Sequence, residues 1–213
     1  MSGPEPHLDE LERDALTELV NIGVSRAAAS LRKMIGHQVL LSVPALEIVS
    51  RRVAATLIKE RETGDLVAVR QDFTGAFAGR ALLIFPEANS LALVRAVTGD
   101  ELDEDGVVDI EDEALSETGN VVLYGCLATM ANMLKRPLEM SLPSVIRGDG
   151  QILFELSEDE GSVGVVLFLY INFSVSGRDI RGYIAMLMDL PSIEALRVLI
   201  GEFLERVVGG DAG

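Results

Sequence analysis

The feature that most constrains the fold of this 213-residue chain is a similarity between its two halves at a shift of 99 positions. Under this shift the segment ELVN at 18–21 falls on ETGN at 117–120, and Pro44 falls on Pro143. Other identities under the same shift are Ala29 with Ala128, Met34 with Met133 and Ser42 with Ser141. The sequence therefore predicts two halves of one design, each about 100 residues long.

We expect a single domain over 1–213 made of two repeats, 8–99 and 108–207. The elements expected in the first repeat are a helix over 8–35, strands over 38–50, 65–71 and 75–85, and a helix over 86–97. Those expected in the second are a helix over 109–134, strands over 138–146, 151–156, 163–174 and 178–190, and a helix over 191–207. Asp9 and Glu12 are a candidate capping box for the first helix, and Gly36 ends it. Each half thus reads as a long helix, about three antiparallel strands and a shorter helix, which is typical of an α+β fold.

The charge of the chain limits its partners. Lys and Arg number 18 against 34 Asp and Glu, a formal net charge of −16. Such a chain repels phosphate backbones and anionic lipid, which argues against nucleic-acid or membrane binding and favours a partner with basic surface. Much of the acid lies in 101–113, which we interpret as a solvated linker. Cys126 is the single cysteine, so no intramolecular disulfide can form, and the N-terminus lacks an apolar signal core. We expect a cytoplasmic location.

A polar stripe marks the long helix of each half. In the first helix Asp14, Glu18 and Asn21 span roughly 60° of the helix circumference, away from the apolar positions. The second helix repeats the arrangement with Glu113, Glu117 and Asn120. A solvated outer face explains either stripe alone. It does not explain why the Glu, the Asn and a proline 23 residues after the Asn recur in both halves, and we therefore treat these residues as candidate site residues.

This pattern resembles that of the CheC, CheX and FliY chemotaxis phosphatases. That family carries Asp or Ser, three residues, Glu, two residues, Asn, twenty-two residues and Pro. The first copy here is Asp14, Glu18, Asn21 and Pro44; the second is Glu113, Glu117, Asn120 and Pro143. The second copy departs from the pattern at Glu113. The resemblance covers nearly the whole chain, including its duplicated layout.

The resemblance implies a phosphatase that hydrolyses the aspartyl phosphate of a phosphorylated CheY-type response regulator. It assigns Asn21 and Asn120 to hold the attacking water and Glu18 and Glu117 to form a salt bridge with the regulator's active-site Lys. An asparagine carboxamide suits this role because it both donates and accepts hydrogen bonds. The supporting residues are Asp14, Pro44, Glu113 and Pro143. The chain is expected to hold no cofactor or metal of its own, because the regulator brings Mg²⁺. The family implies the receptor deamidase CheD as a further partner.

Other readings stay open at this stage. A non-catalytic adaptor or flagellar-switch protein of the same fold is one, although the flagellar protein FliM lacks the Glu and Asn pair. A small-molecule enzyme is another, but it would need a pocket with convergent polar groups, of which the sequence gives no sign. The sequence also carries no P-loop, GxSxG or HExxH motif. His7 and His37 read as solvated side chains. Each of the two prolines is expected to end strand pairing near a site, or to be a structural edge proline.

Overall fold

The long helix α1 (Glu10–Ile35) ends at the predicted residue and begins two residues after the predicted start at Leu8. The computed structural model describes residues 8–98, 110–156, 164–175 and 178–210. At the start of α1 the Asp9 carboxylate accepts from the Glu12 N–H at 2.7 Å, and the Glu12 carboxylate accepts from the Asp9 N–H at 2.9 Å. At its end Gly36 has a left-handed backbone with φ of 72°, which glycine adopts without strain. The predicted capping box and helix end are confirmed.

The elements follow in two similar series. The first is α1, β1 (Val39–Ser50), α2 (Arg51–Arg61), β2 (Leu66–Gly75), β3 (Gly79–Pro86) and α3 (Glu87–Thr98). The second is α5 (Glu111–Leu134), β4 (Leu138–Met140), β5 (Ser144–Gly148), α6 (Gly150–Leu153), β6 (Val165–Val175), β7 (Arg178–Met188) and α7 (Leu190–Gly210). The expected α+β fold, with a long helix, antiparallel strands and a shorter closing helix in each half, is confirmed. The acidic segment up to 109 and the proposed repeat boundaries at 99 and 108 lie outside the described residues, and the boundaries stay a prediction.

Three sequence expectations about local structure are wrong. The segment 151–156 is no strand, because Gly150–Leu153 forms the short helix α6. The Asp149 carboxylate caps its start by accepting hydrogen bonds from the first N–H groups of the helix. The helix α2 was not expected; the Ser50 hydroxyl accepts from the Val53 N–H and caps its start. The strand expected over 138–146 is two strands, β4 and β5, with residues 141–143 between them.

The two halves share one antiparallel sheet of seven strands within the described residues. Its order is β1-β6-β7-β3-β2-β4, and β5 also pairs with β2. The hairpins β2–β3 and β6–β7 form the centre, joined through β3 and β7. Each outer strand pairs with the hairpin of the other half, β1 with β6 and both β4 and β5 with β2. Because of this exchange, the outer strands of each half make their backbone hydrogen bonds with a strand of the other half.

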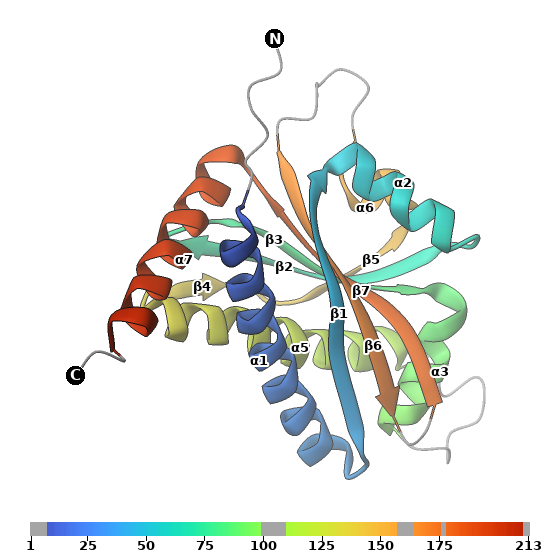
Figure 1. The fold of residues 1–213 in the computed structure, drawn as a ribbon. Helices are drawn as coiled ribbons and strands as arrows, with labels where there is room; N and C mark the ends of the chain where they lie inside the picture. The colour runs from blue at the N-terminus through green and yellow to red at the C-terminus, as the bar shows by residue number, and fades with distance from the viewer. Residues whose placement is uncertain (1–7, 99–109, 157–163, 176–177, 211–213) are drawn as a thin grey trace.

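The sheet lies between two helical layers (Figure 1). Helices α1, α3, α5 and α7 contribute buried side chains to the larger core on one face, and α2 and α6 cover the other face. Helices α1 and α5 cross closely through small residues: a Cβ atom added at Gly23 would lie 2.8 Å from the Cα of Cys126. The two helices that carry the polar stripes are therefore packed directly against each other. Among the described helices, none combines the length and apolarity needed to cross a membrane.

Candidate functional site

The first site lies on α1, beside the edge strand β1. Asp14 and Glu18 are exposed, whereas Asn21, one helical turn beyond Glu18, is half-buried. The Asn21 Oδ1 accepts a hydrogen bond from the Val43 backbone N–H at 3.2 Å. The helix therefore presents a free-standing carboxylate next to a carboxamide that is anchored to the sheet.

Pro44 explains why a strand N–H is available to Asn21. Ser42 pairs with Asn172 and Ala45 pairs with Tyr170, so Val43 and Pro44 lie opposite the single residue Ile171. This is a β-bulge, in which an extra residue leaves the regular ladder. Proline fits there because it has no N–H to lose and because β1 is at the edge of the sheet. The expectation that Pro44 ends strand pairing is wrong, since pairing resumes at Ala45.

The second site has the same helical side chains but a different anchor. Glu113, Glu117 and Asn120 are all exposed on α5. The Asn120 Oδ1 accepts from the Nε2 of Gln71 at 2.9 Å, and the same Nε2 donates to the Ser141 backbone carbonyl at 3.1 Å. Gln71 lies on β2 and is 1% exposed. A buried side chain here replaces the backbone N–H that holds the asparagine of the first site.

The proline of the second site also lies at an irregularity of an outer strand. Residues 141–143 stand between β4 and β5, opposite two residues of β2, Gln71 and Asp72. The outer strand again carries one extra residue. Pairing with β2 resumes at Ser144, so Pro143 interrupts the pairing rather than ending it. By its place opposite the irregularity, Gln71 corresponds to Ile171 in the first site.

Gly119 lets α5 approach the sheet closely enough for this contact. A Cβ atom at Gly119 would lie 2.4–2.6 Å from three side-chain carbons of Val69 on β2, far inside the contact distance of two carbons. The corresponding residue of the first helix is Val20, which is buried in the larger core. The glycine of ETGN, which stands where ELVN has a valine, therefore has a structural cause. It lets α5 come close enough to β2 to bring Asn120 next to that strand.

Gln71 is the residue that sequence reasoning missed. Every second side chain of β2 faces the α5 side of the sheet. Those of Val67, Val69 and Phe73 do so and belong to the larger core. Gln71 occupies the same row, where the period of the strand predicts an apolar residue. A polar residue at a core position of a strand is the signal that could have found it.

Other groups offer little alternative chemistry. Burial raises the pKa of the Cys126 thiol to about 12, and the side chain has no exposed surface, so it cannot serve as a thiolate nucleophile. His37 is exposed just after α1. In the described parts of the chain, no group of three or more His, Cys, Asp or Glu residues is placed to hold a metal ion.

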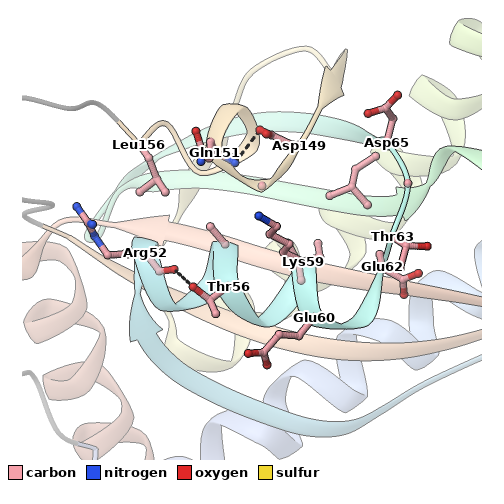
Figure 2. A pocket seen from close by; sticks show the side chains of 15 residues that line it. Arg52, Thr56, Lys59, Glu60, Glu62, Thr63, Asp65, Asp149, Gln151 and Leu156 are labelled. Carbon is pink, nitrogen blue, oxygen red and sulfur yellow. Dashed lines mark hydrogen bonds between the residues drawn. The ribbon is translucent and has the colours of Figure 1, made fainter.

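A separate groove lies elsewhere, on the face of the sheet covered by α2 and α6. It has a volume of about 1180 Å³, and charged side chains of both signs line it (Figure 2). Several of its polar groups serve local structure: the Asp149 carboxylate accepts from the Gln151 N–H, and the Thr56 hydroxyl donates to the Arg52 carbonyl. Neither asparagine lines this groove.

Comparison with known proteins shows similarity to chemotaxis proteins. No protein-family model matches it. It is 21% identical to a putative CheY-P phosphatase, CheC1, from Halobacterium salinarum, over 91% of this chain and 96% of that protein. It is 23% identical to the CheY-P phosphatase CheC of Bacillus subtilis, over 92% of this chain and 97% of that protein.

Solved structures share the fold at low identity. Thermotoga maritima FliY superposes with a TM-score of 0.70 at 16% identity, covering 93% of this chain and all of that one. The middle domain of FliM from H. pylori gives a TM-score of 0.60 at 6% identity, over 90% of this chain and 99% of that one. The relatives that match almost end to end carry CheY-P phosphatase names and FliY shares the fold, so the chain is similar over nearly its whole length to CheC-type chemotaxis phosphatases.

Proposed function

We propose that this protein dephosphorylates a phosphorylated CheY-type response regulator, and that Asn21 and Asn120 each position the attacking water. In this reaction the water oxygen attacks phosphorus and the bond from phosphorus to the aspartyl oxygen breaks, which releases inorganic phosphate. The relatives that match nearly end to end are named for CheY-P phosphatase activity. The observation that carries the mechanistic proposal is the anchored asparagine carboxamide in both sites.

The anchoring suits a group that orients a water. Each Oδ1 accepts one hydrogen bond from the protein, and a carbonyl oxygen has two lone pairs, so one remains for a water proton. The amide NH₂ is left to donate to the water or to a phosphoryl oxygen. A carboxamide held at one end has fewer orientations to lose on reaching the transition state, and the entropic part of the barrier falls accordingly.

The exposed glutamates suit a docking role. Glu18 and Glu117 stand one helical turn before the asparagines and are open to solvent, so each could pair with a basic group of the regulator without first losing a partner. In a complex of this kind, complementary charge acts mainly on association rate and register. The Mg²⁺ that neutralises the phosphate is expected to come with the regulator, and this chain supplies no metal ligand in the proposal.

The alternative is a protein that binds the regulator without hydrolysing its phosphate. The FliM middle domain shares this fold, so the fold alone does not decide between them. Steady-state phosphate release should be measured while a phosphodonor keeps the regulator phosphorylated, and binding to the regulator should be measured in parallel. The proposal expects turnover that is lowered by Asn21→Ala and by Asn120→Ala and abolished in the double variant, with binding retained. Binding without any wild-type turnover would establish the adaptor instead.

A further inference from the structure

We propose that Gln71 is a positioning residue of the second site, which fixes the direction in which Asn120 presents its amide. This inference rests on the proposed phosphatase function for its kinetic consequence, but not for its structural content. It starts from the side chain of Gln71, which is a carboxamide buried on β2, and from the three polar groups around it.

The Ser141 carbonyl determines how the Gln71 amide is turned. A backbone carbonyl can only accept a hydrogen bond, so the Gln71 atom facing it, 3.1 Å away, must be Nε2. The same Nε2 lies 2.9 Å from the Asn120 carboxamide. Since Nε2 can only donate, the Asn120 atom facing it must be Oδ1. One fixed carbonyl therefore sets the orientation of both amides in turn.

The amide NH₂ of Asn120 then takes no part in the anchoring contact. With Oδ1 turned toward Gln71, Nδ2 is on the opposite side of the carboxamide, and the side chain as a whole is exposed. The first site reaches the same orientation by a different route, because the Val43 N–H can only donate and so also selects Oδ1 of Asn21. Both sites thus anchor the asparagine through Oδ1 and leave its NH₂ group available as a donor, although their anchoring donors have nothing in common in sequence.

Gln71 lowers the stability of the folded state in a way that a purely structural residue would avoid. Its Oε1 is buried and has no hydrogen-bond partner, and an unsatisfied buried polar atom disfavours the folded state. The neighbours in its row, Val69 and Phe73, are apolar and fully buried. The corresponding residue of the first site, Ile171, is apolar as well. A leucine at position 71 would fill the space without the orphan oxygen, and the Ser141 carbonyl that it leaves belongs to an exposed residue, where water can replace the lost donor. Stability alone therefore does not explain the glutamine.

The two sites of one chain provide the matched control. Gln71→Leu should be combined separately with Asn21→Ala, which leaves the second site, and with Asn120→Ala, which leaves the first. In the Asn21→Ala chain we expect Gln71→Leu to lower kcat on the order of 10-fold with KM unchanged, because Glu117 still docks the regulator while the amide is no longer oriented. In the Asn120→Ala chain we expect kcat to change by less than about twofold, since the first site is anchored through Val43.

A structural role for Gln71 would give a different pattern. It would lower activity in both backgrounds together and would reduce the melting temperature, whereas the proposal expects a melting temperature that is unchanged or higher. Equal loss in both backgrounds, or no loss in either, overturns the inference.

A second readout does not depend on catalysis. The side-chain ¹⁵NH₂ order parameter of Asn120 should be high in the wild-type protein and fall toward that of a free surface asparagine in Gln71→Leu. The NH₂ group of Asn21 serves as the internal reference and should not change. An Asn120 amide that is equally ordered with and without Gln71 refutes the inference even if the protein proves to have no phosphatase activity. If the wild type has no activity but the order parameter falls as expected, the proposed function fails and the positioning contact stands.

Discussion

Gly119→Ala tests whether the second site depends on the close approach of α5 to β2. The added Cβ would lie 2.4–2.6 Å from Val69 carbons, whereas two carbons in contact prefer about 3.5–4.0 Å. The helix must therefore move outward by roughly 1 Å. Overpacking of this kind costs about 1–3 kcal/mol, and the better helix propensity of alanine returns up to about 1 kcal/mol. We expect a net destabilisation of about 1 kcal/mol.

Gly201→Ala is the matched control, because a Cβ atom there meets nothing within 4 Å and Gly201 also lies within a helix, α7. It should stabilise the protein by about 0.5–1 kcal/mol through helix propensity alone. Urea unfolding followed by circular dichroism, with a second probe to check that the transition is two-state, measures both free energies of unfolding. The two variants are expected to change stability in opposite directions.

The same shift of α5 should also lower turnover at the second site. Moving Asn120 by roughly 1 Å breaks its contact with Gln71, and a displacement of this size can cost on the order of 10²-fold in rate. In the Asn21→Ala chain, which reports the second site, Gly119→Ala should lower turnover by about 10-fold or more. Val69→Ala should restore part of it by making room. If Gly119→Ala stabilises the protein as Gly201→Ala does and leaves second-site turnover intact, the close-packing argument is wrong.

Three further results are expected. Burial raises the pKa of the Cys126 thiol from 9.0 to about 12, so the unfolded chain releases a proton above pH 9 that the folded chain retains. The free energy of unfolding should then fall by up to about 1.4 kcal/mol per pH unit between pH 9 and pH 12. Cys126→Ala should show a shallower loss of stability in urea titrations at alkaline pH. Asp9→Ala removes the capping box and should cost about 1 kcal/mol in the same assay; an unchanged midpoint would show that this end of α1 does not contribute to cooperative unfolding. Glu18→Gln with Glu117→Gln should raise KM several-fold and weaken its dependence on salt, and a KM that keeps its value and its salt dependence would exclude docking by these carboxylates.

The sequence was sufficient where local chemistry decides the structure. Asp9, Glu12 and Gly36 delimit α1 because capping and a left-handed backbone are local requirements. The recurrence of the Glu, Asn and Pro pattern predicted two similar series of elements and where the candidate residues lie on their helices. The expected α+β class followed from the same spacing.

The sequence was insufficient where long-range packing decides. The segment 151–156 is apolar enough to read as a strand, but the Asp149 cap begins a helical turn instead. The exchange of outer strands between the halves has no local signal, since β1 pairs with β6 across more than 100 residues of chain. Gln71 became a site residue only because that exchange places β4 and β5, and with them Ser141, beside β2.

The most direct test of the two-site account is the rate at which a phosphorylated CheY-type regulator loses its phosphate in Mg²⁺. The decay should be recorded for the regulator alone, with the wild-type chain, and with a chain carrying both Asn21→Ala and Asn120→Ala. We expect faster decay with the wild type and a return to the regulator's own rate with the double variant, which keeps both glutamates and is expected to bind. A double variant as active as the wild type, or a wild type that leaves the decay unchanged, would contradict it.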